Sequence, residues 1–329
     1  MPSLPVRVLR WSLIQFRWYR LLPQTLWGDG IFAQLHCLRH NGYLPRTSGG
    51  DLTDFLAFLK GSPEIETALR KQLSDKATLK SIVAQRLGED YCVPTYAVLQ
   101  SDWEIDTFDF PAQCVIKPTH SSGQIIIRKA GEPIDCHKIK SWLRFNFYRV
   151  GRERNYFGLP PRIMVEEWLG PGDILEVKIH CYRGKPVEAL MFHAIRGSNG
   201  QPMGIFYLDL QARVVEVLGT PAESEVDRQK LFNGLFPGLT TFGQLLEVAQ
   251  KMSDGLLFAR IDLYLTEAGI KVGEVTTSNN NGVFYTSTSA EQQRGLRYYG
   301  PAGFCLEDFP ELSRPFWLRS MKPGGDALE

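Results

Sequence analysis

The sequence contains no run of about 18 apolar residues, the length that a helix needs to cross a lipid bilayer. We therefore expect no transmembrane helix. The opening stretch VRVLRWSLIQFRWYRLL has arginines among its aromatic residues and lacks an uninterrupted apolar segment followed by a cleavage site. It is therefore not predicted to be a signal peptide.

The chain also lacks closely spaced cysteines. Its six cysteines are scattered, and no two of them form a C-x-x-C pair. This spacing argues against a zinc site of the usual kind and against a dense disulfide framework. It predicts reduced thiols and a cytoplasmic location.

An excess of charge of one sign is missing as well, since 37 basic and 36 acidic residues give a formal net charge of +1. Global charge therefore gives no reason to expect a nucleic-acid partner. Hydrophobic content of 43% and charged content of 22% are those of a globular protein, which excludes disorder of the whole chain. The 329 residues are enough for two or three domains.

The first part of the chain has the pattern of helices. Asp51 is predicted to cap a helix over LTDFLAFLK, with Asp54 at its third position. Residues 66–88 are helical in period and end at Gly88. We expect a mainly helical N-terminal region over residues 1–92.

From Val93 the pattern changes to strands, in VPTYAVL, FPAQCVIKP, GQIIIRKAG and PRIMVEEWL. A hairpin is expected over DILEVKIHCYRGKPVEALMF, followed by strands GIFYLDL and ARVVEVLG and an amphipathic helix over residues 240–256. Residues 141–158 are expected to form a basic aromatic helix and loop, which is either a solvated face or a docking surface for an anionic substrate.

The stretch from Ala259 to Val283 reads as two apolar strands, ARIDLYL and GIKVGEVTT, joined by a turn. Each strand carries one carboxylate, Asp262 or Glu274. Two facing carboxylates repel each other and are costly to bury, and a divalent metal would relieve both effects. Ordinary alternation on a surface strand produces the same pattern, so these residues alone leave both interpretations open.

Six motifs in a fixed order resemble the ATP-grasp superfamily, and within it the TupA-like ATP-grasp proteins of polysaccharide and teichuronopeptide biosynthesis. They are SDKATLK, CVIKPTHSSG, PRIMVEEWL, EVKIHCYRGKP, ARIDLY and GEVT, and the resemblance covers roughly Leu38 to Val283. It implies an α+β ATP-grasp fold, with ATP held between two subdomains. We place these at residues 93–170, with the phosphate loop, and 171–329, with the magnesium site.

The resemblance also implies roles for individual residues. Lys117, Arg260 and Arg196 are the expected catalytic residues, with Arg196 on the substrate side. ATP is expected to contact Lys76, Lys117, the loop Thr119, His120, Ser121, Ser122 and Gly123, the hinge Glu167, Trp168 and Leu169, and Glu176. Lys178 shares a face of its strand with Glu176 by the period of two, so we expect it either to line the ATP site or to form a cross-strand ion pair at the surface. Mg²⁺ is expected at Asp262, Glu274 and Thr276.

Two departures from the family pattern concern the loop and the metal end of the site. Thr119 and Ser121 stand where an asparagine and a glycine are common, and Thr276 stands where many ATP-grasp enzymes have an asparagine. Asn279, Asn280 and Asn281 follow closely, and the sequence leaves open whether they bind metal or substrate.

The expected activity is that of a magnesium-dependent ligase, which joins a carboxylate to an amine through an acylphosphate with release of ADP. An acidic glycan and a small amino acid are the candidate substrates. The alternatives are a kinase for a hydroxyl group and a nucleotide-binding scaffold without turnover, although the scaffold is disfavoured because Lys117, Asp262 and Glu274 are all present. His120 and His180 are weaker candidates for a base.

The N-terminal basic aromatic helix leaves a second question open. Such a helix either lies on an anionic membrane surface or packs its aromatic side chains on its own domain. We expect a cytoplasmic protein, with peripheral contact to the inner face of the membrane as the open alternative. No nucleic-acid partner is expected.

Overall fold

A computed structural model describes residues 4–170, 174–196, 202–218, 225–278 and 298–312. The chain folds into two compact units. Unit 1 takes in Met1–Ala68, Tyr148–Phe157 and Ser278–Glu329, and unit 2 takes in Leu69–Phe147 and Gly158–Thr277. The predicted helical region 1–92 is thus divided between both units.

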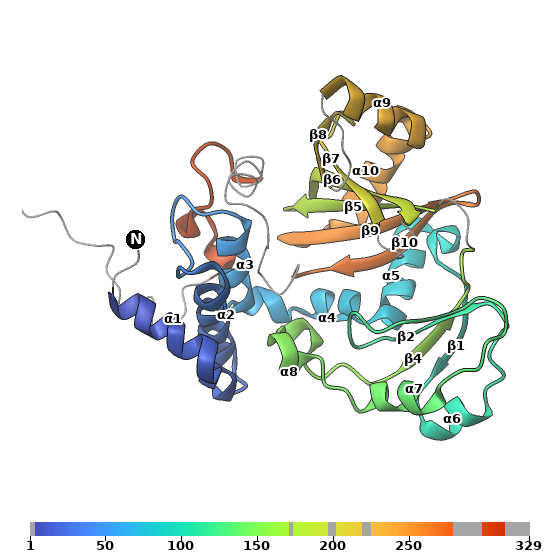
Figure 1. The fold of residues 1–329 in the computed structure, drawn as a ribbon, viewed down its shortest axis with the longest axis horizontal. Helices are drawn as coiled ribbons and strands as arrows, with labels where there is room; N and C mark the ends of the chain where they lie inside the picture. The colour runs from blue at the N-terminus through green and yellow to red at the C-terminus, as the bar shows by residue number, and fades with distance from the viewer. Residues whose placement is uncertain (1–3, 171–173, 197–201, 219–224, 279–297, 313–329) are drawn as a thin grey trace, which may run out of the picture. The chain divides into compact units, whose positions relative to one another are not determined.

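Unit 1 is built from helices, as expected for the N-terminal region (Figure 1). They are α1 (Leu4–Phe16), η1 (Trp18–Leu21), α2 (Leu26–Asn41), α3 (Leu52–Lys60), η2 (Pro63–Glu66), α8 (Tyr148–Gly151), η4 (Arg154–Tyr156), η6 (Leu306–Asp308) and η7 (Pro310–Leu312). The Asp51 side chain accepts a hydrogen bond from the Thr53 amide at 2.9 Å, and Asp54 accepts one from the Asp51 amide at 2.8 Å. The predicted capping box of α3 is confirmed.

Residues 148–157 fold with unit 1 around the buried carboxylate of Asp29 in α2. The Tyr148 hydroxyl donates to it, and Arg152 and Arg154 form ion pairs with it at 2.8 and 3.1 Å. The helix and loop predicted over residues 141–158 are observed as the end of α7 (Cys136–Leu143) followed by the short helices α8 and η4. Arg152 and Arg154 form neither a solvated face nor a docking surface, since their charges bind a buried acid.

Unit 2 contains two antiparallel sheets. The four-stranded sheet has the order β1-β4-β2-β3, from β1 (Thr95–Leu99), β4 (Ile163–Glu166), β2 (Cys114–Pro118) and β3 (Ile126–Arg128). Apolar side chains of α6 (Asp102–Thr107) and α7, including Ile105, Ile139 and Trp142, pack with this sheet. The four strands predicted in this region are confirmed.

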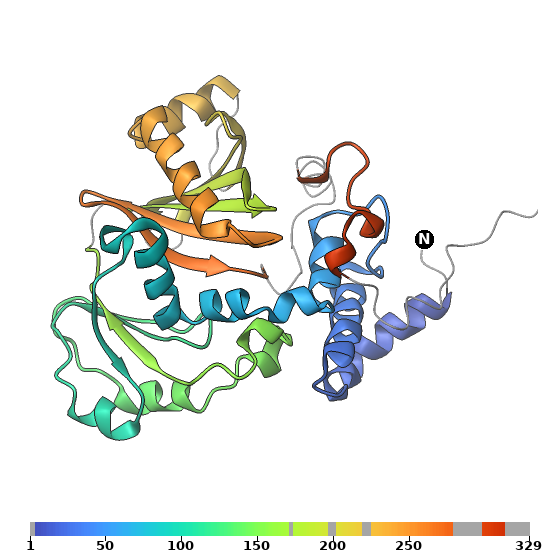
Figure 2. The same cartoon turned by 180° about the vertical axis from the view of Figure 1, so that it is seen from behind.

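The six-stranded sheet has the order β10-β9-β5-β6-β7-β8, and every neighbouring pair is antiparallel. Its strands are β5 (Leu175–Tyr182), β6 (Lys185–Arg196), β7 (Pro202–Leu208), β8 (Val214–Leu218), β9 (Phe258–Thr266) and β10 (Gly269–Thr276). Helices α9 (Glu225–Leu235) and α10 (Leu239–Ser253) are also part of this half of unit 2, as Figure 2 shows from behind. Both predicted hairpins and the last amphipathic helix are confirmed.

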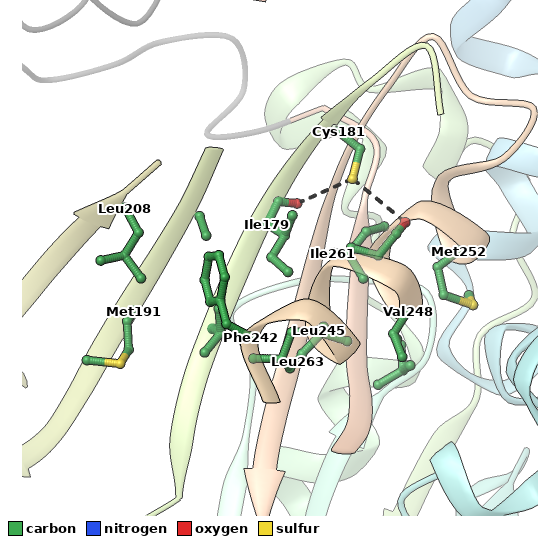
Figure 3. Close-up of a cluster of buried hydrophobic side chains, with 14 of the residues drawn as sticks. Ile179, Cys181, Met191, Leu208, Phe242, Leu245, Val248, Met252, Ile261 and Leu263 are labelled. Atoms are coloured by element: carbon green, nitrogen blue, oxygen red, sulfur yellow. Dashed lines mark hydrogen bonds between the residues drawn. The ribbon is translucent and has the colours of Figure 1, made fainter. Parts of the chain in front are cut away.

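Helix α10 packs on the six-stranded sheet and builds the main core of unit 2. Leu245, Val248 and Met252 of the helix lie among side chains of the central strands such as Ile179 and Ile261 (Figure 3). Apolar side chains of β5 and β9 pack against α10 on one face of the sheet. Alternate side chains of the same strands point to the opposite face, where packing against the helix fixes the position of the polar residues.

The predicted helix over residues 66–88 is two helices, α4 (Ala68–Ser74) and α5 (Lys76–Leu87), so that prediction is corrected. Asp75 separates them and caps α5, because its side chain accepts a hydrogen bond from the Ala77 amide at 2.9 Å. Gly88 ends α5 with a φ of 111°, as predicted. The break makes Lys76 the first residue of α5.

All six cysteines are free. In the part of the chain that the structure describes, no helix is both long and apolar enough to span a bilayer.

Candidate active site

A β-bulge at Gly273 places the two predicted metal carboxylates opposite each other. Val272 pairs with Leu263, and after Gly273 the register shifts so that Glu274 pairs with Asp262. Without the extra residue, Gly273 would lie opposite Asp262. The bulge therefore turns the Glu274 position toward its partner acid.

The Asp262 carboxylate is buried and lies between two cations. Arg260 contacts it through Nε at 2.6 Å, and Lys178 contacts it through Nζ at 3.0 Å. Burial by itself raises the pKa of Asp262, but the charges of Arg260 and Lys178 outweigh this effect and lower it. The side chain is thus a carboxylate at neutral pH.

Strand register explains why these side chains meet. Lys178 of β5 pairs with Asp262 of β9, and the side chains two residues apart on one strand share a face. Lys178 accordingly also forms an ion pair with Glu176 at 3.0 Å. The Arg260 guanidinium donates to the Thr276 hydroxyl at 3.1 Å, which connects β9 to the end of β10.

A second group of charges lies on the four-stranded sheet around Glu166. Lys117 of β2 and Glu166 of β4 are diagonal neighbours, because Lys117 pairs with Met164 and Val115 pairs with Glu166. Their side chains form an ion pair, and Lys80 of α5 contacts the other Glu166 oxygen at 3.1 Å. Burial raises the pKa of Glu166, yet Lys117 and Lys80 lower it further than burial raises it.

Lys76 connects the two groups. Its Nζ donates to the Ser121 carbonyl oxygen at 2.6 Å and lies 3.8 Å from the Glu274 carboxylate. Burial lowers the pKa of Lys76, and the positive charge of Lys117 lowers it further. One lysine thus touches the loop after β2 and the carboxylate on β10.

The loop Thr119–Gly123 is fixed at its first residues. The Lys76 amide donates to the Thr119 carbonyl at 3.1 Å, and the Thr119 amide donates to the Arg162 carbonyl at 2.9 Å. The Thr119 hydroxyl is buried and forms no hydrogen bond within the described residues. Gly123 is exposed and has a φ of 81°, a conformation that favours glycine.

Both predicted candidates for a base are held by protein groups. The Nε2 atom of His120 lies 3.2 Å from the Phe145 carbonyl oxygen, and the Arg162 amide donates to its Nδ1 at 3.4 Å. Burial lowers the pKa of His120, so its ring is neutral. His180 lies 3.3 Å from the buried Glu188 carboxylate.

The predicted hinge follows β4 directly. The Glu167 amide donates to the Pro94 carbonyl oxygen at 2.9 Å, so this backbone is attached to the segment before β1. Lys129 lies over the Trp168 ring at 5.8 Å from its centre. Glu167, Trp168 and Leu169 are all half-buried.

The metal end of the site has oxygen donors from two strands. Among the residues described, no group of three or more histidine, cysteine, aspartate and glutamate side chains could hold a metal ion. The pair Asp262 and Glu274 nevertheless fits Mg²⁺, because this ion prefers oxygen ligands and often takes only one or two protein carboxylates. Phosphate and water oxygens would supply its other ligands.

Three residues of this arrangement were not predicted as site residues. Glu166 and Lys80 lie in the family motifs but were not predicted to have a role, and Gly273 was predicted to be part of a regular strand. Two predicted parts of the substrate side are not covered by the described residues. Arg196 is the last residue of β6, but its side chain is not described, and Asn279–Asn281 lie outside the described residues.

Comparison with known proteins assigns the chain to a protein family. Residues 58–295, more than half of the chain, match the family profile described as TupA-like ATPgrasp. No curated protein matches the sequence significantly.

Solved structures give weaker likenesses. The L-amino acid ligase from Bacillus licheniformis is 13% identical with a TM-score of 0.39, and the match covers 94% of this chain but only 63% of the ligase. The D-alanine–D-alanine ligase from Bacillus anthracis is 15% identical with a TM-score of 0.37, covering 83% of this chain and 72% of that chain. At these scores the assignment rests on the family profile.

Proposed function

Because the chain belongs to the TupA-like ATP-grasp family, we propose that it is an ATP- and Mg²⁺-dependent ligase that joins a carboxylate to an amine. The γ-phosphoryl group of ATP passes to a carboxylate oxygen, which gives an acylphosphate and ADP. The amine nitrogen then attacks the acyl carbon, an amide bond forms, and phosphate and a proton leave.

One observation carries this proposal, namely the position of Lys76. Its ammonium group lies against the Ser121 carbonyl of the glycine-containing loop and 3.8 Å from Glu274. A nucleotide whose phosphates lie under this loop would have its terminal phosphate close to Glu274 and Asp262. That is where a phosphate-bound metal needs carboxylate ligands.

Three cations of the site are proposed to act on the phosphates. Lys76 and Lys117 bind phosphate oxygens as point charges, and Arg260 offers planar donors to the phosphoryl group in transfer. Bound Mg²⁺ would be held by Asp262 and Glu274 and would neutralise the charge that develops on the phosphates. Positioning and charge neutralisation account for most catalysis of such a step, so no protein nucleophile is required.

Arg260 and Lys178 now satisfy the Asp262 carboxylate. We propose that arrival of the nucleotide divides this network, with the guanidinium of Arg260 turning toward phosphate and Asp262 toward the metal. The exchange keeps every buried charge paired before and after binding.

The remaining ATP contacts follow from the hinge and from β5. The backbone of Glu167–Leu169 is proposed to bind adenine, and Glu176 the ribose hydroxyls. An acidic glycan and a small amino acid are the proposed substrate classes, with Arg196 and the Asn279–Asn281 run on the substrate side.

The decisive experiment measures ADP release from ATP and Mg²⁺ in the presence of candidate carboxylates and amines. The double variant Asp262→Asn/Glu274→Gln is expected to lose turnover. Glu267→Gln is the matched control, because Glu267 is exposed in the turn of the same hairpin. Full turnover in the double variant would disprove the metal assignment.

Hydroxylamine separates ligase from kinase activity. An acylphosphate reacts with it to give a hydroxamate, whereas a phosphorylated hydroxyl group does not. A hydroxamate that depends on ATP and on the carboxylate supports the ligase, and a stable phosphate ester without hydroxamate supports the kinase.

A further inference from the structure

Helix α1 has two apolar sides, and within the described residues of unit 1 only one of them is packed. Val6, Leu9 and Leu13 pack with the cluster that contains Phe32 and Leu38 of α2. On another side of the helix, Leu4, Val8 and Trp11 are 71%, 58% and 57% exposed. Their spacing of four and three residues places them on one helical face.

The exposed apolar surface continues beyond α1. Of the 19 exposed large apolar side chains among the described residues, eight lie between residues 4 and 27, and we call these eight the N-terminal apolar surface: Leu4, Val8, Trp11, Ile14, Phe16, Trp18, Leu21 and Trp27. The Trp11 and Phe16 rings are in edge contact, and the Trp18 indole donates to Ser12 at 3.3 Å. Single exposed apolar residues are ordinary, but such a concentration marks an interaction surface.

Charge in this segment is of one sign. Residues 1–28 include four arginines and no aspartate or glutamate. Arg7, Arg17 and Arg20 are exposed. The first acid of the chain, Asp29, is buried and bound to Arg152 and Arg154, so it does not offset the arginines at the surface. A chain with a net charge of +1 thus has a locally cationic apolar surface.

We propose that residues 4–27 dock on an anionic lipid surface. Leu4, Val8 and Trp11 enter the interface between headgroups and acyl chains, where indole rings are favoured. Arg7, Arg17 and Arg20 bind lipid phosphates while their apolar stems remain near the hydrocarbon. The 13 residues of α1 span about 20 Å at 1.5 Å per residue, so the helix is suited to lie on a bilayer and is too short to cross it.

Lipid fits this surface better than a protein partner does. Protein interfaces are also enriched in aromatic residues and arginine, but they have an apolar core surrounded by a separate polar rim. Here Arg7 lies within the run of exposed apolar residues on α1, and further arginines follow in the same segment. A membrane interface accommodates both kinds of side chain at different depths.

The test is co-sedimentation of the full chain with vesicles of phosphatidylcholine, either alone or mixed with phosphatidylglycerol. We expect binding to the mixed vesicles, little binding to phosphatidylcholine, and weaker binding as salt is raised. Leu4→Ser/Val8→Ser/Trp11→Ser and Arg7→Gln/Arg17→Gln/Arg20→Gln should each bind about tenfold more weakly. Trp103→Ser is the matched control, since Trp103 is 72% exposed on α6 and lies between Asp102 and Glu104.

Circular dichroism and thermal unfolding check that the variants fold. If a triple variant does not fold, the single variant Trp11→Ser replaces it in the vesicle experiment. Wild-type protein that stays in the supernatant with mixed vesicles overturns the proposal. So does equal binding to both vesicle types. A concentration-dependent dimer that the serine variant abolishes, without vesicle binding, would assign the surface to a second copy of the chain instead.

Discussion

A methyl group on Gly273 would lie 2.5 Å from the ring of Tyr264, on the neighbouring strand. The bulge that sets Glu274 opposite Asp262 therefore requires a residue without a side chain at this position. The geometry of the proposed metal site thus depends on a residue that contributes no side chain to it.

The first prediction follows from this contact. Gly273→Ala should destabilise the protein by about 2 kcal/mol, because the ring or the bulge must move, and it should weaken magnesium-dependent nucleotide binding. Adding Tyr264→Leu should restore part of both losses in a double-mutant cycle. Gly243→Ala is the control, since this helical glycine in α10 has open space around it and the change is expected to be neutral or stabilising. An unchanged Tm and unchanged binding in Gly273→Ala would contradict the role of the bulge.

The second prediction concerns Glu166, which lies between Lys80 and Lys117. Glu166→Gln leaves two lysines close together without their shared carboxylate, so the free energy of unfolding should fall by about 2 kcal/mol. Glu167→Gln, at a half-buried neighbour, should change it by less than about 0.5 kcal/mol. Urea unfolding of both variants measures the difference, and equal effects would show that the lysines do not depend on Glu166.

The third prediction uses the lowered pKa of Lys76. The proposed phosphate binding requires the charged ammonium group of Lys76. ATP affinity should therefore be highest at pH values below the pKa of Lys76 in the free protein. It should fall as pH rises through that pKa, which lies below the ordinary lysine value of about 10.4. Calorimetric titration with ATP between neutral and alkaline pH follows this loss.

Two variants isolate the contribution of Lys76. Lys76→Arg should retain affinity at alkaline pH, because a guanidinium group stays charged there. Lys76→Met should bind about tenfold more weakly at neutral pH and should lack this part of the pH dependence. Identical pH profiles for the wild type and Lys76→Met would refute the assignment.

Features that depend on neighbouring residues could be predicted from the sequence. Strands, hairpins and the cap at Asp51 are local patterns, and each was predicted from neighbouring residues. The shared face of Glu176 and Lys178 follows from strand periodicity in the same way. The family motifs identified the charged residues that the fold gathers, although their order alone does not give distances.

The features that were not predicted depend mainly on contacts between parts of the chain that are distant in sequence. Asp29 meets Arg152 across more than a hundred residues, and nothing local in RVGRERN indicates a buried acid as its partner. The bulge at Gly273 was hidden because GIKVGEVTT alternates well enough for a regular strand. By contrast, the break at Asp75 left a local signal, because Ser-Asp before a helical run is typical of a cap.

The final prediction compares the two carboxylates of the proposed metal site in the absence of nucleotide. Asp262→Asn removes the carboxylate charge that Arg260 and Lys178 share and should cost about 3 kcal/mol of unfolding free energy. Glu274→Gln should cost less than about 1 kcal/mol, since its carboxylate is 3.8 Å from Lys76 and more exposed. Chemical unfolding at neutral pH measures both.

Acid provides the internal check on Asp262. Its pKa is lowered in the folded protein, so its contribution to stability is present above the unfolded value of about 3.9 and is lost as pH falls through the folded value. The stability difference between wild type and Asp262→Asn should therefore shrink as the pH falls below about 4. A difference that stays constant down to the acid transition would mean that packing rather than charge holds Asp262 in place. The exchange of its partners on nucleotide binding would then lose its electrostatic basis.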